Sequence, residues 1–564
     1  MNKISSFSYF LRKSPVVRTG GWICAALLFV IVSVIFGMRI QQKPEIESIV
    51  PPVGSPGDLI IITGRDFGAV RDTSYVEFGG SRLTSSSYIS WTDTEIKVIL
   101  PPNIQDGLVF VGVKNVRSKP AFFANATTAP VAVTSSVQTT LPIITGISPE
   151  KLSPGVLMTI SGSNFGNSRD KSKVYFSSNR EKMQAEEGPA DDTFEFICAD
   201  ENDFDYQYWS DSEIRVYVPD GASDGVVFVQ TSRGKSAQRT VAVDNKSGTK
   251  SFISPKTYVI QIAADIEDNS SDRDSTIILR VPRPFESAAQ PSATLIESSP
   301  EPIIPDFQHT VIHQAQGGKY AAGKRRFTQN FAVTVYETRT NVVAARLNPI
   351  SSVNKELYSA ATSADEIVPS ANEEIRALLS SVIGKERNPY NIAVLVYNYM
   401  IQNFEILNTV RTGRVSPLDM LDSKKGDAYD FAVVFTALMR AAGIPAYTDS
   451  GVLVGVDLRA KNHWWCELYL PGFGWFPVDP ALGAGMEYQG WKKDVDAATF
   501  YFGNLDGQHI LFSRGLNEIK SSSPNSKTVQ KSRSFALQSV WEEASGKSIK
   551  YSSYWAEPSV IGVY

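Results

Sequence analysis

The chain has 564 residues, of which 42% are hydrophobic and 20% charged, and its formal net charge is -4. A chain of this length exceeds one hydrophobic core and should divide into several domains of about 100–200 residues. Its composition is ordinary for folded protein and argues against extensive disorder. The slightly negative charge and the lack of a Lys/Arg-rich run with interleaved aromatics exclude nucleic acid as an expected partner.

Residues 20–38 form the first predicted element, an apolar stretch without a charged residue. Its length just spans a bilayer core as a helix. The positive-inside rule predicts a cytoplasmic tail over residues 1–19, a transmembrane anchor over 20–38 and an extracytoplasmic remainder. A cleaved signal peptide is the alternative, but the apolar run is long and no small-residue cleavage motif follows it. The basic residues that set this orientation precede the stretch, with no acidic residue among them: Lys3, Arg12, Lys13 and Arg18.

Two later stretches repeat one pattern. Residues 62–68 (ITGRDFG) match residues 160–166 (ISGSNFG), and a Trp-Thr/Ser-Asp motif follows each copy. Short Val, Ile and Phe runs alternate with Gly, Pro, Asp and Ser, which is typical of a small antiparallel sandwich. We therefore predict all-β immunoglobulin-like domains over 43–124 and 141–245, joined by a small-residue linker over 126–140.

These repeats resemble the IPT/TIG family of immunoglobulin-like domains, in which a Pro-Gly turn leads into a strand and a Gly precedes Phe-Gly. The turns are Pro56-Gly57 and Pro154-Gly155. The resemblance implies spacer or interaction modules and not enzymes. The second copy carries an extra acidic segment, from about Glu181 to Asp205. It lacks the Gly-turned acidic alternation of an EF-hand loop, so a solvated loop is favoured over a calcium site.

A third strand-rich region, residues 250–348, predicts another β-sandwich. It contains His309 and His313, whose spacing suits a metal but whose strand and loop context argues against ligation. Of the three cysteines, Cys24 falls in the apolar stretch, which leaves Cys198 and Cys466. That number fits neither a disulfide framework nor a zinc site, and a single disulfide cannot be inferred. We predict no cofactor and no metal.

From about residue 370 the apolar spacing changes to three and four residues, which predicts helices over 373–379 and 391–404. A third helix is expected to begin just after Gly426 and to end before Gly443. The aromatic run that starts at His463 predicts a strand, and a Pro-Gly turn leads from it into a returning strand over 475–480. The apolar face of the third helix consists of Phe431, Val434, Phe435, Leu438 and Ala442.

This order of elements resembles the transglutaminase-like superfamily, which is related in mechanism to papain. The resemblance implies an α+β core over 350–564 with a C-terminal β extension. In the family, a cysteine opens the helix, a histidine lies on the strand and an aspartate lies on its hairpin partner. The matching positions here are Ala428, His463 and Asp479. A thiolate at that position would attack an amide, but a methyl group cannot, so Ala428 marks a degenerate nucleophile position.

Three nearby side chains are candidate substitutes for the missing thiol. Cys466 is three residues from His463 on one strand, so the two side chains should point to opposite faces. Tyr429 is a poor nucleophile without a strong base. Asp427 precedes the helix and is better explained as its cap.

The retained His463 and Asp479 have two interpretations. If Leu470 pairs with Gly474 in the hairpin, both side chains lie on one face of the sheet. They are then either a leftover structural hydrogen bond or part of a cleft that binds a peptide or glycan without cleaving it.

The sequence therefore predicts a bacterial membrane-anchored surface protein, located in the periplasm or at the cell surface. Its degenerate transglutaminase-like domain would bind or scaffold a peptide, protein or cell-wall ligand. An active cysteine-type transglutaminase, amidase or peptidase with another nucleophile is the alternative. A purely structural envelope component is a third hypothesis.

Overall fold

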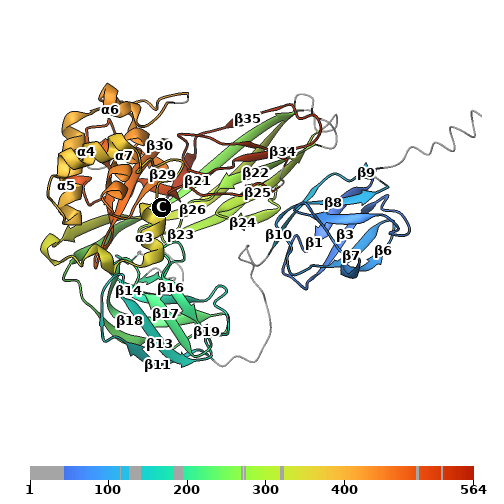
Figure 1. Ribbon diagram of the computed structural model, residues 1–564, viewed down its shortest axis with the longest axis horizontal. Coiled ribbons are helices and arrows are strands. Elements are labelled where there is room, and N and C mark those ends of the chain that lie inside the picture. The colour runs from blue at the N-terminus through green and yellow to red at the C-terminus, as the bar shows by residue number, and fades with distance from the viewer. Residues whose placement is uncertain are drawn as a thin grey trace, which may run out of the picture. The chain divides into compact units, whose positions relative to one another are not determined.

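In the computed structural model, the chain divides into two compact units, Met1–Phe123 and Ala124–Tyr564 (Figure 1). The predicted tail, the membrane segment 20–38 and the linker 126–140 lie outside the described residues. Among those that are described, no helix combines the length and the apolar character needed to cross a bilayer. The described residues are 43–114, 116–125, 141–182, 195–268, 271, 275–317, 323–413, 415–490, 495–522 and 525–564.

The first unit contains a two-sheet sandwich. Alternate residues of its strands point inward, so Ile60 and Ile62 are buried with Phe78 and Phe123. One sheet has the order β1 (Glu45–Val50), β3 (Leu59–Arg65), β7 (Glu95–Ile99), β6 (Tyr88–Trp91), and a 3-10 turn, η1, covers Ser85–Ser87. The other has the order β2 (Val53–Gly54), β10 (Ala121–Asn125), β8 (Gly107–Val113), β4 (Tyr75–Phe78), β5 (Ser81–Arg82), with β9 (Val116–Arg117) beside β8.

The glycine of the repeated motif is required by close packing. A Cβ at Gly64 would lie 2.0 Å from the Glu45 carbonyl oxygen and 2.5 Å from the Phe67 ring. In the second repeat, a Cβ at Gly162 would lie 2.0 Å from the Ile143 carbonyl oxygen. Only glycine allows this approach of backbone and aromatic ring, which explains why the motif appears twice.

The second unit begins with the second repeat, which has the same strand order. One sheet runs β11 (Ile143–Ser148), β13 (Leu157–Ser163), β17 (Glu213–Tyr217), β16 (Tyr206–Trp209). The other runs β12 (Lys151–Leu152), β20 (Arg239–Val243), β18 (Ala222–Thr231), β14 (Lys173–Ser178), β15 (Phe196–Cys198), with β19 (Gly234–Lys235) beside β18.

The extra acidic segment of this repeat differs from the expected solvated loop. Residues 183–194 lie outside the described part of the chain, but the next residues form strand β15, and Asp205 behind it is buried. Asp203 makes an ion pair with Arg514 of the core. The expectation of a solvated loop is therefore wrong for β15, Asp203 and Asp205, whereas Glu201 and Asn202 are exposed as such a loop would be.

The third sandwich is built from two distant parts of the sequence. Its first sheet runs β23 (Ser292–Ser299), β26 (Gly323–Val342), β21 (Gly248–Asp268), β35 (Tyr551–Trp555), with β36 (Ser559–Val563) also on β21. Its second runs β24 (Ile304–Phe307), β25 (Thr310–Gln316), β22 (Thr276–Pro282), β34 (Glu542–Ser545), β33 (Lys527–Val529). The expected C-terminal β extension of the core thus completes this sandwich. The strands after residue 350 therefore pair with strands before it, and the predicted boundary at residue 350 does not divide the sandwich from the C-terminal strands.

The α+β core contains the helices and one four-stranded sheet, which Figure 1 shows as neighbours at one side of the second unit. The sheet runs β31 (Gly474–Val478), β30 (Ala460–Leu470), β29 (Ala446–Val454), β32 (His509–Arg514), and β27 (Glu405–Ile406) pairs with β28 (Lys425–Gly426). The helices are α3 (Lys355–Thr362), α4 (Glu373–Ile383), α5 (Pro389–Asn403), α6 (Asp419–Ser423), α7 (Ala428–Ala441), α8 (Pro480–Gly483) and α9 (Ala497–Phe500), with 3-10 turns η3 (Ala344–Arg346) and η4 (Ile350–Ser352) before them.

Two sequence predictions about this core are confirmed. Helix α7 begins at Ala428, and Gly443 follows its end with a φ of 75°. Leu470 pairs with Gly474 in the β30–β31 hairpin, as the predicted register requires.

The two faces of the core sheet have different surroundings. Trp464, Cys466 and Leu468 on β30 join the apolar core around α7. The alternate residues point the other way, because side chains alternate along a strand. Trp465 packs there with Phe285 of the third sandwich. The sheet therefore has α7 on one face and the β-sandwiches on the other.

Candidate functional site

The position at which the sequence motif predicts a nucleophile is the first residue of α7. Ala428 is 5% exposed and follows Asp427, which caps the helix. The Asp430 backbone N–H donates to Asp427 Oδ1 at 3.1 Å, and the Asp427 N–H donates to Asp430 Oδ2 at 2.9 Å. This reciprocal capping box satisfies two helix-start donors and confirms the interpretation of Asp427 as a cap.

Two arginines complete the start of the helix. The Arg533 guanidinium donates to both Asp427 oxygens, at 2.6 and 2.7 Å, and to Asp430 Oδ1 at 2.7 Å. The Arg411 guanidinium pairs with Asp430 at 2.6 Å. Burial raises the pKa of Asp427, with Asp430 adding to the effect, while Arg411 and Arg533 oppose it. We call Asp427, Asp430, Arg411 and Arg533 the helix-start cluster; it holds two carboxylates and two guanidinium groups.

The structure brings His463 and Asp479 together. His463 Nε2 lies 2.6 Å from Asp479 Oδ2, and the two residues are 1% and 0% exposed. Asp479 Oδ1 accepts from the backbone N–H groups of Ala481 at 3.1 Å and Leu482 at 2.9 Å, and thereby caps α8. Asp479 thus orients the imidazole and also fixes the chain that follows β31.

A second histidine extends this pair. His509 Nε2 lies 3.2 Å from Asp479 Oδ2, and its Nδ1 lies 2.9 Å from Asp506 Oδ1. The Tyr501 hydroxyl donates to Asp506 Oδ2 at 2.8 Å. Burial opposes protonation of His509, but Asp506 and Asp479 outweigh it and raise its pKa to about 9. Burial favours neutral Asp479, yet the two histidines hold its pKa below the usual value.

These side chains have the spacing of a metal site. One ligand atom each from His463, Asp479 and His509 lies within 4.8 Å of the others. All three atoms already take part in the hydrogen bonds described above, and the second Asp479 oxygen caps α8. Hydrogen bonding therefore accounts for this arrangement without a cation.

The other predicted candidates have structural roles. Cys466 Sγ contacts the Ala432 carbonyl oxygen at 3.2 Å, and burial raises the pKa of its thiol well above the usual value. Burial raises the pKa of Tyr429 to about 12. His313 binds the Gln329 amide at 2.7 Å, while His309 packs its ring on Phe285. Cys198 and Cys466 are both free thiols, so they form no disulfide.

Tyr429 and Trp464 link the two halves of the candidate site. Their rings meet edge to face at 5.5 Å. Tyr429 follows Ala428, and Trp464 follows His463. The helix start and the histidine strand are therefore in contact through the residues next to Ala428 and His463.

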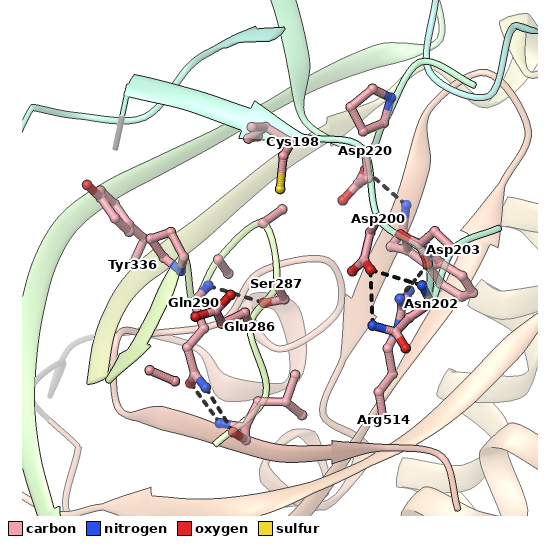
Figure 2. A pocket seen from close by; sticks show the side chains of 18 of the residues that line it. Cys198, Asp200, Asn202, Asp203, Asp220, Glu286, Ser287, Gln290, Tyr336 and Arg514 are labelled. Atoms are coloured by element: carbon pink, nitrogen blue, oxygen red, sulfur yellow. Dashed lines mark hydrogen bonds and ion pairs between the residues drawn. The ribbon is translucent and has the colours of Figure 1, made fainter. Parts of the chain in front are cut away.

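A cavity of about 560 Å³ lies where the second repeat, the third sandwich and the core meet. Figure 2 shows the segment from Asp200 to Asp203 beside Arg514, and Glu286 to Gln290 across from it. The core contributes the face of its sheet that points away from α7, including Asp449, Trp465, Glu467 and His509. Ala428 and His463 are not among the lining residues. The size suits a small-molecule or side-chain ligand.

Sequence reasoning missed several of these residues. Arg533 lies 106 residues from Asp427, and His509 lies 30 residues from Asp479. No local pattern joins such partners. A fully buried histidine usually has a polar partner. The sequence did not predict that His509 is buried, so it gave no usable signal for this residue.

Comparison with known proteins assigns families to two parts of the chain. Residues 376–480 match the transglutaminase-like superfamily. Residues 44–131 and 142–182 match the IPT/TIG domain. The chain therefore carries a transglutaminase-like core and IPT/TIG domains, as the motifs predicted.

The individual relatives cover only parts of the chain. An uncharacterized protein of Haemophilus influenzae is 31% identical over 168 residues, which is 25% of this chain and 46% of that protein. A cyclomaltodextrin glucanotransferase of Bacillus licheniformis is 42% identical over 62 residues, 11% of this chain and 8% of the enzyme. The chain thus spans less than half the length of these curated relatives.

Two solved structures resemble parts of the fold. A protein of Cytophaga hutchinsonii, provisionally described as a cysteine protease, is 16% identical with a TM-score of 0.36, covering 56% of this chain and 93% of its own. The periplasmic domain of TgpA from Pseudomonas aeruginosa is 14% identical with a TM-score of 0.23, covering 39% and 87%. With TM-scores this low, neither likeness supports a statement about function.

Proposed function

We propose that the transglutaminase-like core of this chain is non-catalytic and serves to bind or scaffold a ligand at the cell envelope. The observation that carries the proposal is Ala428 at the first position of α7, in a core that keeps the hydrogen-bonded pair of His463 and Asp479. Thiol chemistry needs an atom at this position that can attack a carbonyl and later leave. A methyl group does neither.

No neighbouring group supplies the missing chemistry. Cys466 packs against the middle of α7 and its raised thiol pKa disfavours the thiolate. Asp427 is engaged by Arg533 and by the helix backbone. The thiolate form of Cys466 is disfavoured, and the carboxylate of Asp427 is occupied by a guanidinium and by helix hydrogen bonds, so neither side chain is free to act as a nucleophile.

The retained histidine and aspartate have a structural role in this proposal. Asp479 accepts from His463 on β30, from His509 on β32 and from the first turn of α8. The pair therefore joins two strands and a helix through one buried carboxylate. This network needs no thiol, so the pair has a structural role without the chemistry.

Binding is supported by the way the modules meet around the cavity. Lys250 of the third sandwich pairs with Asp220 of the second repeat at 2.6 Å and with the Trp475 carbonyl of the core. Lys250 is buried there. Ligand sites commonly form at such junctions between modules. A peptide, protein or cell-wall ligand is the proposed class of partner.

We further propose that residues after Arg39 are extracytoplasmic, on the basis of the apolar stretch 20–38 and its basic flank. An alkaline phosphatase fusion near residue 130 should be active, and a reporter that works only in the cytoplasm should be silent there. The reverse pattern would reject this topology.

The loss of catalysis is tested with Ala428→Cys in the full-length chain. The positive end of α7 and His463 should hold the pKa of the introduced thiol below the reference value of about 8.5. Iodoacetamide should therefore alkylate it at neutral pH, faster than Cys198 and Cys466. His463→Ala in the same background should remove part of the effect.

The wild-type chain is the decisive control. Incubated with an acyl donor such as a glutamine-containing peptide ester, it should form no covalent adduct detectable by mass spectrometry. An adduct on Cys466, Cys198 or any other side chain would establish the enzyme alternative and reject the proposal.

A further inference from the structure

The cavity face of the core sheet carries more buried carboxylates than cations. Arg514 makes ion pairs with Asp203 and Glu467, and its guanidinium lies 4.0 Å from the centre of the Trp475 ring. Asp449 lies next to Arg514 across the β29–β32 pair. Two carboxylates thus contact this guanidinium, and a third, Asp449, lies on the neighbouring strand at the same level. We call Asp203, Asp449, Glu467 and Arg514 the cavity cluster.

Asp449 is the unsatisfied member of this cluster. It is 2% exposed and lines the cavity, and its Oδ1 finds no hydrogen-bond partner among the described residues. The Trp465 side chain hydrogen bonds the carboxyl group and favours its charged form. A buried acceptor without a partner costs stability, so its presence beside a cavity indicates that something else completes it.

The protonation of the cluster agrees with a missing cation. Burial is the main reason why the pKa of Asp203 is raised to about 7 and why that of Asp449 is raised well above its usual value. Burial likewise raises the pKa of Glu467 against the opposing effect of Arg514. Burial thus favours the protonated forms of these acids, and a bound cation would favour their ionised forms.

Three other cations around the cavity are already engaged. Lys250 is held by Asp220, Arg283 lies 3.7 Å from Asp306, and Arg180 donates to the carbonyl oxygens of Ala288 and Phe196. Lys173 lies in the part lined by Cys198 and Glu286, which influence its charge. Figure 2 shows Cys198 and Glu286 away from Arg514. The carboxyl group of Asp449 is left for a cation from outside.

The lining favours an organic cation over a metal ion. Trp465 and Trp475 both line the cavity, and aromatic faces attract ammonium and guanidinium groups. Arg514 stands among the same carboxylates, and its positive charge repels a divalent ion strongly but a monovalent one less. Calcium also needs six to eight oxygen ligands.

We propose that this cavity binds an organic cation, a primary ammonium or guanidinium group on a peptide or small molecule, with Asp449 as its anchoring carboxylate. The inference rests on the proposed binding function and gives it a site and a ligand class. It also separates the binding site from Ala428 and His463, which do not line the cavity.

The test uses the full-length chain and three probes: Nα-acetyl-lysine methylamide, its Nε-acetylated neutral analogue, and Nα-acetyl-arginine methylamide. Titration is followed by calorimetry and by fluorescence of Trp465 and Trp475. A charged probe should bind at least about tenfold more tightly than the neutral one, the effect expected of one buried charged hydrogen bond.

Asp449→Asn should weaken binding of the charged probe about tenfold or more without lowering the melting temperature, because the amide keeps the shape and needs no counter-charge. The matched control is Asp306→Asn. Asp306 also lines the cavity, but its side chain is half-exposed. Its change should alter binding by less than about twofold, since exposed charge pairs contribute little.

Equal affinity for charged and neutral probes, unchanged binding by Asp449→Asn, or binding of calcium alone would each overturn the inference. These outcomes differ from those that test catalysis. If the charged probes fail to bind while the wild-type chain forms no acyl adduct, the non-catalytic function stands and only this ligand class falls.

Discussion

The helix-start cluster and the cavity cluster are both buried networks of carboxylates and arginine, but the ratio of carboxylates to guanidinium groups differs between them. At the start of α7, Asp427 and Asp430 meet Arg411 and Arg533. On the far face of the sheet, three carboxylates lie near Arg514. A buried charge is tolerated when it is paired and hydrogen-bonded. The helix-start cluster therefore holds equal numbers of carboxylates and guanidinium groups, although Arg411 Nε has no hydrogen-bond partner among the described residues, whereas the cavity cluster has room for a cation.

The largest effect on stability is expected from removing one cation of the helix-start cluster. Arg533→Met removes the guanidinium that binds both Asp427 oxygens and Asp430. Two buried carboxylates would keep only Arg411, and the loss of one partner of such a pair costs about 3–5 kcal/mol. Urea denaturation should show a lower midpoint. The control is Arg459→Met at an exposed pair, which should change the free energy of unfolding by less than about 0.5 kcal/mol.

A smaller, pH-dependent effect should distinguish the cavity cluster. Burial raises the pKa of Asp203 to about 7, above its value of about 3.9 in an unfolded chain. The folded state thus binds the proton more tightly. The stability it gains is full below about pH 4 and is lost as pH rises through about 7.

The free energy of unfolding of Asp203→Asn, relative to that of the wild type, should therefore rise by about 2–4 kcal/mol between pH 4 and pH 8. The size of the pKa shift sets the upper end of this range. Urea midpoints at several pH values measure it. A difference that stays constant with pH would show that Asp203 is ionised throughout, and the clusters would then not differ in this respect.

The smallest effect has the opposite sign to the first. Asp449→Asn replaces a buried carboxyl group that has an unpartnered oxygen with an amide that does not ionise, so the free energy of unfolding should rise by about 1 kcal/mol at alkaline pH, where the carboxyl group of the wild type loses its proton. Guanidinium denaturation without ligand measures it. Asp427→Asn serves as the matched change in the helix-start cluster. It should destabilise the chain, because Arg533 would lose a charged partner. If both variants lose stability, the cavity cluster is as complete as the helix-start cluster.

The sequence was informative wherever neighbours in the chain decide the structure. The repeated Gly-x-x-Phe-Gly motifs predicted two sandwiches, because only glycine fits at Gly64 and Gly162. The helix pattern placed the start of α7 just after Gly426, and the Pro-Gly turn set the register that pairs Leu470 with Gly474. The degenerate position was likewise visible from the family motif alone.

The sequence did not predict contacts between side chains that lie far apart along the chain. It gave no reason to join Arg533 to Asp427, or His509 to Asp479. It also favoured a solvated loop for the acidic insert, because nothing in the sequence of the insert predicts its ion pair with Arg514. The C-terminal strands showed their β character, but their pairing with β21 and β22 depends on contacts across nearly 300 residues.

By itself, the sequence determined the succession of β modules and α+β core and the register that brings His463 to Asp479. Local propensity, turn chemistry and strand alternation are sufficient for these. Tertiary structure alone decided that the helix start is neutralised by Arg411 and Arg533 and that Asp449 is left unpaired beside a cavity. Charge balance in a buried site depends on which distant side chains share its volume, and that is fixed only when the modules pack.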